Sequence, residues 1–246
     1  MIPIDKLCYH SRLRYESPGV KLAFSLITLV ACVANRSAVL SLVILVIMGM
    51  LTVVRGGIPF SRYLKLMTVP LVFLLMSTLA IAFDFGFWYI TCSAASVYYA
   101  VNLVITALAA VSCLYFLSLT TPMTDILAVL SAMHMPRTII ELMLLIYRFI
   151  FLLLEIAEAV QVSQYSRLGN RDYKTSIKSF SALCSILMIR AVTRSRVLYQ
   201  AMEARCYDGT FRFLNEAKRA SKKNKVLLTL YGLAFLIFTL WRFYYG

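Results

Sequence analysis

Long runs of apolar residues with short polar breaks dominate the first half of the chain. Residues 22–54 are apolar apart from Asn35-Arg36-Ser37. One helix of that length would measure about 50 Å, whereas the hydrocarbon core of a bilayer is about 30 Å thick. We therefore expect two membrane spans joined by a tight outer turn at residues 35–37, with Arg36 reaching the headgroups.

The same pattern predicts two further spans, at residues 66–83 and 97–119. Residues 55–65 contain Gly and Pro breakers and are expected to form an inner loop. Residues 84–89, Asp-Phe-Gly-Phe-Trp-Tyr, are typical of an outer loop with an interfacial aromatic belt. Residues 90–96 are rich in small side chains, and their pattern is ambiguous.

Apolar helices with a narrow polar stripe begin at residue 121. The charges of Glu141, Arg148 and Glu155 recur every seven residues, which returns them to within about 20° of one helix face. A membrane span here would place residues 161–225, with 14 Lys and Arg, on the outer side. Because basic segments stay inside, we predict an amphipathic helix at the inner membrane surface or packed against other helices.

Two arginines stand where helices are predicted to end. Arg167 precedes a Gly-Asn stop signal, and Arg205 follows an amphipathic helix predicted over residues 180–204 and precedes the turn Asp208-Gly209. The C-terminus of a helix favours a cation. For Arg205 the sequence allows a solvated basic residue or a plug offered to a carboxylate on another protein, because a guanidinium presents a rigid fork of donors.

Composition and charge support a membrane protein. The chain has 246 residues, of which 61% are hydrophobic and 15% charged, whereas a soluble domain is nearer half apolar and a quarter charged. Residues 121–225 hold 16 Lys and Arg against 8 Asp and Glu, within a net charge of +14. Concentrated positive charge marks the cytoplasmic side, so nucleic acid is not an expected partner, and the basic N-terminus is also placed inside. No removed signal peptide is expected.

The predicted fold class is therefore an all-α integral membrane protein with about five transmembrane helices. The fifth span is predicted at residues 226–240, after a basic cluster and before an outer aromatic belt. A helical module between spans four and five lies in the cytoplasm. The regions are residues 1–120 with four spans, residues 121–225 with the cytoplasmic or interfacial helices, and residues 226–246 with the last transmembrane helix.

Catalytic, metal and cofactor motifs are missing from the sequence. The nine glycines form no P-loop, His10 and His134 stand alone, and the six cysteines form no C-x-x-C pair. No catalytic residue, metal site or cofactor is predicted. The predicted spans hold almost no ionisable residue, and carriers driven by ion gradients keep such charges at depth. This pattern disfavours a self-contained secondary transporter.

Five segments together resemble the transmembrane T component of energy-coupling factor (ECF) transporters, in its cobalt/nickel, CbiQ-like branch. The resemblance covers nearly the whole chain. The segments are Tyr9-His-Ser-Arg-Leu-Arg-Tyr with Ser17-Pro-Gly-Val-Lys-Leu, Gly57-Ile-Pro-Phe-Ser-Arg-Tyr, Thr121-Pro-Met-Thr-Asp-Ile-Leu, the helix from Glu141 to Glu155, and Met202-Glu-Ala-Arg-Cys-Tyr-Asp-Gly.

The resemblance implies a non-catalytic subunit of an ATP-driven importer in the cell membrane. Its partners would be two ATPase (A component) subunits, bound at the cytoplasmic helices, and a separate membrane subunit (S component) that captures cobalt or nickel. Family members carry two coupling helices that end in a short motif centred on arginine, usually Ala-Arg-Gly. The matching arginines are Arg205 and Arg167, although Cys206 replaces the usual glycine.

Other residues are assigned by the same resemblance. The helix with Glu141, Arg148 and Glu155 would transmit motion to the spans. The residues that support the coupling motif are Ser166, Leu168, Glu203, Ala204, Cys206, Asp208 and Gly209. The alternative that the sequence leaves open is a membrane scaffold or enzyme whose basic surface binds anionic lipid.

Overall fold

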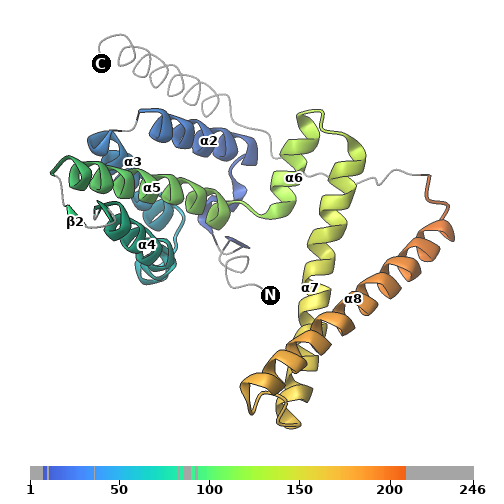
Figure 1. Ribbon diagram of the computed structural model, residues 1–246. Coiled ribbons are helices and arrows are strands. Elements are labelled where there is room, and N and C mark those ends of the chain that lie inside the picture. The colour runs from blue at the N-terminus through green and yellow to red at the C-terminus, as the bar shows by residue number, and fades with distance from the viewer. Residues whose placement is uncertain are drawn as a thin grey trace. The chain divides into compact units, whose positions relative to one another are not determined.

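The computed structural model describes residues 8–9, 11–35, 37–82, 84–85, 90–91 and 94–208, and these residues are mostly helical (Figure 1). A two-residue antiparallel strand pair is a minor exception. The elements in chain order are η1 (Arg12–Tyr15), α2 (Pro18–Asn35), α3 (Ala38–Met50), the π-helical turn η2 (Leu51–Arg55), α4 (Phe60–Ala82), β1 (Asp84–Phe85), β2 (Ile90–Thr91), α5 (Ala94–Thr120), α6 (Met123–Ala132), α7 (Arg137–Ser166) and α8 (Tyr173–Glu203).

The described residues fall into two compact units, and the division lies inside α6, between Val129 and Leu130. The first unit contains η1 to α5 and the start of α6. The second contains the end of α6 with α7 and α8. The three regions expected from the sequence, with boundaries at residues 120 and 225, differ from these units because they describe membrane location. That division stays a prediction.

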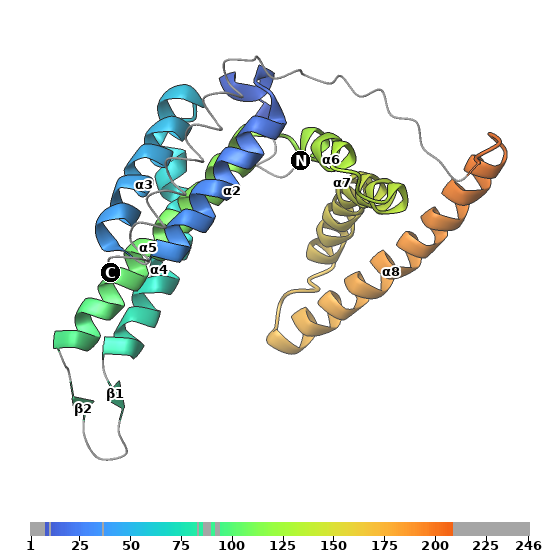
Figure 2. The ribbon, with the colours of Figure 1, turned by 90° about the horizontal axis from the view of Figure 1, so that it is seen from above.

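Helix α5 is the centre of the first unit. It packs against α2, α3 and α4 and lies between α2 and α4 in the ribbon (Figures 1 and 2). Small residues make this close packing possible, because Ala109, Ser112 and Cys113 of α5 are fully buried. The core cluster around them consists of Cys32, Ile44, Met48, Ala109, Cys113 and Phe116.

Hydrogen bonds between side chains and neighbouring helices also hold the first unit together. The Ser25 hydroxyl of α2 donates to the carbonyl of Cys113 at 2.8 Å. The hydroxyls of Tyr63 on α4 and Ser112 on α5 lie 2.8 Å apart. Polar groups in a bilayer need partners within the protein, so these bonds fix how the helices of the first unit pair.

Among the residues that the structure describes, five helices are long and apolar enough to cross a membrane: α2, α3 with η2, α4, α5 and α8. The chain is thus an all-α, multi-pass membrane protein. The predicted break after Asn35 is confirmed, since α2 ends there and α3 begins at Ala38. The predicted fourth span is confirmed by α5. The inner loop expected at residues 55–65 is wrong in extent, because α4 begins at Phe60.

The early start of α4 follows from Pro59. Its carbonyl accepts hydrogen bonds from the backbone N–H groups of Arg62 and Tyr63. Since a proline lacks an N–H of its own, it suits the beginning of a helix. The basic residues Arg62 and Lys65 therefore lie in the first turns of α4 rather than in a loop.

Helix α8 also starts before its predicted first residue, 180. The Thr175 hydroxyl accepts from the backbone N–H of Asp172 at 2.9 Å and so caps the helix, which begins at Tyr173. By length and composition α8 is among the five candidate spans, whereas α7 is not. Arg36, the loop at residues 86–89, Gly209 and the span predicted at residues 226–240 lie outside the described residues.

Candidate functional site

Helix α7 ends in a Schellman motif, in which the chain closes the last turn through a left-handed residue. The N–H of Gly169 donates to the carbonyl of Gln164 at 2.8 Å, and the N–H of Leu168 donates to the carbonyl of Tyr165 at 3.1 Å. Leu168 has a φ of 57°. Arg167 directly precedes this left-handed residue.

Helix α8 ends in the same motif. The N–H of Tyr207 donates to the carbonyl of Met202 at 3.0 Å, and the N–H of Cys206 donates to the carbonyl of Glu203 at 3.0 Å. Cys206 has a φ of 56°, and Arg205 directly precedes it. Arg167 and Arg205 therefore occupy equivalent places in two equivalent helix ends, although Ser-Arg-Leu and Ala-Arg-Cys share only the arginine.

Cys206 stands at the position where a Schellman motif usually has glycine. A residue with a Cβ atom in the left-handed region costs about 1–2 kcal/mol, and glycine adopts that conformation freely. The backbone nevertheless makes the turn at Cys206, as it does at Leu168 and at His134 after α6, where φ is 61°. The replacement of glycine by Cys206 therefore keeps the shape of the helix end.

Both arginine side chains are exposed. Within residues 94–208, neither guanidinium has a hydrogen bond or an ion pair with another side chain. Each positive charge instead stands over the negative end of a helix, which favours it there. Five N–H donors in a planar fork remain available, and this geometry matches a carboxylate bidentately.

The two arginine-bearing ends are far apart. The ribbon places the end of α7 and the end of α8 at opposite ends of α8 (Figure 1). Helix α8 has 31 residues, so at 1.5 Å per residue it is about 46 Å long. One small acidic group cannot reach both guanidinium groups, and the arrangement provides two separate binding points.

The turn between α7 and α8 is tightly packed around Gly169. The Ser179 hydroxyl of α8 donates to the carbonyl of Gly169 at 2.7 Å, and the Gln164 amide of α7 donates to the carbonyl of Ser179 at 2.9 Å. A Cβ atom at position 169 would lie 2.7 Å from the Ser179 hydroxyl oxygen. It would also lie 3.0 Å from the backbone carbonyl oxygen of Gln164, so the close packing of this turn favours glycine.

A hydrogen bond links the segment after α8 to the beginning of α7. The Tyr207 hydroxyl donates to the Glu141 carboxylate at 2.9 Å. This bond to Glu141 is the main reason that the pKa of Tyr207 is raised above its usual value. A phenol keeps its proton at neutral pH even at its usual pKa, so the bond is present there, and the raised pKa extends it to higher pH. Glu141 is buried, while Arg148 and Glu155, which share its predicted stripe, are exposed.

The remaining predicted residues lie at the two helix ends, where their groups bond to the backbone or face solvent. The Ser166 hydroxyl donates to the carbonyl of Val162 at 3.0 Å, and the N–H of Ala204 donates to the carbonyl of Gln200 at 3.0 Å. Glu203 contributes its carbonyl to the second motif. Leu168 and Asp208 are exposed.

Sequence reasoning missed three contributors: Tyr207, Gln164 and Ser179. Tyr207 lies inside the recognised segment from Met202 to Gly209, which marks it as a candidate. Nothing in the sequence identifies Glu141 as its partner, 66 residues away. Gln164 and Ser179 are ordinary polar residues of amphipathic helices, and only the packing around Gly169 reveals their role.

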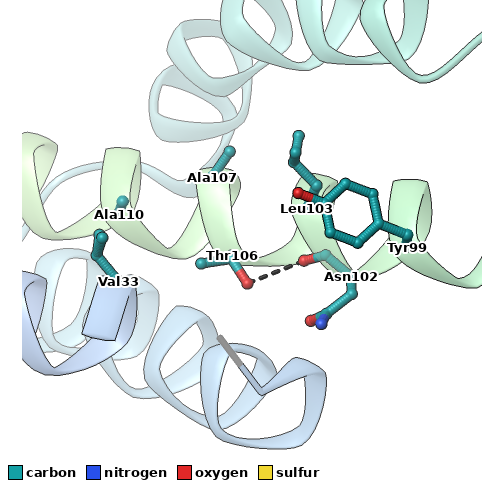
Figure 3. Close-up of a pocket in the computed structure, with 7 residues that line it drawn as sticks. All are labelled: Val33, Tyr99, Asn102, Leu103, Thr106, Ala107 and Ala110. Atoms are coloured by element: carbon teal, nitrogen blue, oxygen red, sulfur yellow. Dashed lines mark hydrogen bonds between the residues drawn. The ribbon is translucent and has the colours of Figure 1, made fainter. Parts of the chain in front are cut away.

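A cavity of about 280 Å³ lies between α2 and α5 in the first unit. Figure 3 shows the Thr106 hydroxyl bonded to the carbonyl of Asn102, at 2.9 Å, on its wall. The lining residues are Val33, Tyr99, Asn102, Leu103, Thr106, Ala107 and Ala110. None of these carries an imidazole, thiol or carboxylate, and the part of the chain that the structure describes contains no cluster of three metal-ligating side chains.

Comparison with known proteins gives a consistent match. Residues 10–214 match the family model CbiQ, described as cobalt transport protein. A cobalt transport protein CbiQ of Salmonella typhimurium is 25% identical over 224 residues, which are 86% of this chain and 99% of the relative. A putative fused cobalt transport protein CbiMQ of Methanocorpusculum labreanum is 34% identical over 218 residues, 84% of this chain and 36% of the relative. An uncharacterized protein of Methanocaldococcus jannaschii is 30% identical over 244 residues, 95% of this chain and 91% of the relative.

Proposed function

Because the chain belongs to the CbiQ family of cobalt transport proteins, we propose that it is the coupling subunit of an ATP-driven importer of the energy-coupling factor type. Membership of this family implies that the chain is a membrane component of cobalt transport. The proposal adds that two ATPase subunits dock on the arginine-bearing ends of α7 and α8. A separate membrane subunit would capture the cobalt or nickel ion.

The observation that carries the proposal is the equivalence of Arg167 and Arg205. Two identical backbone motifs present two exposed guanidinium groups at ends separated by about the length of α8, roughly 46 Å. A repeated docking element at that spacing suits two copies of one partner better than a single partner. An acidic groove on each ATPase would supply the carboxylate that a guanidinium fork recognises.

Placing α8 at the inner surface, rather than through the bilayer, is part of the proposal. The helix runs from Tyr173 to Glu203, so Arg190 and Arg194 lie near its middle. Each would sit deep in hydrocarbon if α8 crossed the membrane, at a cost of about 2.5–3.5 kcal/mol per arginine. An interfacial helix keeps these charges at the headgroups and its apolar residues in contact with the membrane or a partner.

Helix α7 provides a route from the docking ends toward the membrane. Tyr207, two residues after Arg205, holds Glu141 near the start of α7. Along the same helix, Leu142, Ile146 and Ile150 recur every four residues and are exposed by 52%, 57% and 42%. When closure of the ATPases around ATP displaces the arginines, this apolar row would pass the displacement to the membrane subunits.

A separate capturing subunit is supported by the fused relative. Its name joins CbiM to CbiQ, and only 36% of its length matches this chain. A part of transport machinery that is fused in one protein can be a separate chain in another. The ion would then be bound by that partner, and the present chain would contribute motion.

Charge reversal at one docking end tests the proposal. In proteoliposomes that contain the co-purified complex, Arg205→Glu should abolish most ATP-dependent cobalt uptake, because the carboxylate would repel an acidic groove. The control Arg171→Glu makes the same charge change at an exposed residue outside the motif and should retain uptake. Wild-type uptake by Arg205→Glu would refute docking through this arginine.

The lipid-binding alternative makes a different prediction. A surface that only attracts anionic lipid would weaken smoothly as salt rises, because exposed charges are screened. It would also respond equally to Arg205→Glu and Arg171→Glu. The two proposals are therefore separated by the same pair of variants.

A further inference from the structure

Three of the recognised segments have no part in the arginine-bearing ends, and in the first unit the first of them contacts residues that flank the other two. The Ser11 hydroxyl donates to the carbonyl of Gly56, beside the second segment, at 3.1 Å. The Lys21 ammonium of the first segment donates to the carbonyl of Thr120, which directly precedes the third segment, at 2.9 Å. The first segment thus reaches the end of α5, where Leu119 also packs with Ile58 and Tyr63 of the second segment.

Lys21 is the centre of this arrangement. Its side chain is only 5% exposed, and its ammonium also donates to the carbonyl of Leu13, within η1, at 3.0 Å. Thr120 is the last residue of α5, so its carbonyl belongs to the negative end of that helix. A buried ammonium needs such partners, and charge-assisted bonds of this kind are strong. Lys21 therefore fastens the end of α5 to α2 and η1.

The same segment also contacts the next helix, α6, in its second half. Gly19, two residues before Lys21, faces the side chain of Val129 on α6, and a Cβ atom at position 19 would lie 3.8 Å from it. Only Thr121 and Pro122, both buried, separate α5 from α6. Residues 17–22 thus support the joint between α5 and α6 from both sides.

We propose that Lys21 is a positioning residue for transport, which holds the α5–α6 joint rigid. Helix α6 leads the chain from the first unit into the second, so a force on α7 reaches α5 through this joint. With Lys21 in place, the end of α5 must move together with α2 and η1. Without it, the force bends the chain at residues 120–122 and is not passed on. This inference rests on the proposed coupling function and adds a role that the docking arginines do not have.

The test measures docking and coupling separately in the co-purified complex. Lys21→Met replaces the ammonium with an apolar chain of similar length. We expect ATPase subunits to co-purify at the wild-type level and uptake per ATP hydrolysed to fall about tenfold, the effect of losing one charged hydrogen bond on a conformational equilibrium. Lys65→Met, at an exposed lysine of α4, is the control and should match the wild type.

A second variant keeps the inference testable if Lys21→Met does not accumulate in the membrane. Gly19→Leu should push α6 away from α2 while the ammonium is unchanged, and uptake per ATP should fall. Gly19→Ala adds only a Cβ atom at ordinary contact distance and should stay close to the wild type. A wild-type ratio of uptake to ATP hydrolysis in Lys21→Met would overturn the inference. If Lys21→Met is not produced, the same ratio in Gly19→Leu would overturn it.

The outcome also distinguishes this inference from the proposed function. If wild-type protein brings down no ATPase, the coupling function itself is wrong. If the wild type is coupled and Lys21→Met is coupled equally well, only the role of Lys21 is wrong. Loss of both ATPase binding and uptake in well-folded Lys21→Met would mean that Lys21 is needed for docking itself, and would also contradict the positioning role.

Discussion

At the scale of single residues, the left-handed positions after the two arginines explain how different sequences make the same helix end. Leu168 and Cys206 have φ values of 57° and 56°. Each of these residues turns the chain away from the helix, so that the preceding arginine lies at the C-terminal end of the helix. Because the hydrogen bonds are made by the backbone, the side chain at the left-handed position is free to vary.

Replacing Cys206 by glycine should stabilise the end of α8. Glycine removes a left-handed strain of about 1 kcal/mol, which for a chain of this size raises the melting temperature by about 2–4 °C. Cys184→Gly is the matched control, because it places glycine at an exposed site inside α8 and should lower the melting temperature. Thermal unfolding in detergent measures both. Destabilisation of equal size in the two variants would contradict the role assigned to Cys206.

The sequence located both arginines at helix ends correctly, since Gly169-Asn170 and Asp208-Gly209 are recognisable stop signals. It did not reveal that Leu168 and Cys206 are left-handed, because neither residue type prefers that conformation. The equivalence of the two ends lies in backbone geometry. It therefore required the structure, although the sequence resemblance had already paired the two arginines.

At the scale of elements, close packing and hydrogen bonds, rather than burial of apolar surface, determine the shape of the turn between α7 and α8. Gly169, Gln164 and Ser179 meet there through two hydrogen bonds. Farther along, the two helices diverge (Figures 1 and 2). The angle between the two arginine-bearing helices thus depends on a few atoms beside the turn and on the Tyr207–Glu141 bond, which joins the segment after α8 to the start of α7.

A double-mutant cycle tests this dependence. Gly169→Ala should cost about 1–3 kcal/mol of stability, because its Cβ atom would meet the Ser179 hydroxyl. Ser179→Ala removes that hydroxyl and its bond, at a cost of about 1 kcal/mol. The double variant should cost less than the sum, since the clash with the hydroxyl is absent. Additive losses in thermal unfolding would show that the two residues do not meet as described.

Element boundaries were predicted less well than element types. Periodicity located α5 and the helix around residues 141–155, but it missed the starts of α4 and α8. The polar residues at the start of α4 were assigned to a loop, and those at the start of α8 were left out of the predicted helix. Pro59 and the Asp172–Thr175 cap begin these helices early, and local capping is hard to distinguish from loop composition when basic residues follow it.

At the scale of the whole molecule, docking of ATPases at both arginines requires both ends of α8 to lie on the cytoplasmic side. Length and composition alone would allow α8 to cross the membrane. Charge argues against crossing, because Arg190 and Arg194 would lie near the bilayer centre. Among the five candidate spans found in the described residues, α8 is therefore the one that we place by its charge rather than by its hydropathy.

Labelling with a membrane-impermeant maleimide decides the placement of α8. Single cysteines at position 206 and, as Tyr173→Cys, at the start of α8 are introduced into a background without other cysteines; Tyr173 is 82% exposed. Both should be labelled in inside-out vesicles and neither in right-side-out vesicles. Labelling of the two positions from opposite faces would mean that α8 spans the membrane.

A pull-down from membranes shows whether Arg167 and Arg205 dock two ATPase subunits. The tagged wild type is compared with Arg167→Ala/Arg205→Ala and with the control Arg137→Ala/Arg171→Ala, which removes the same charge at exposed residues outside the motifs. Wild type and control should bring down the ATPase pair. The double variant should lose it, because truncating a buried charge pair at an interface costs about 2–5 kcal/mol. Retention of the ATPases by Arg167→Ala/Arg205→Ala, or their absence from the wild-type eluate, would contradict the account.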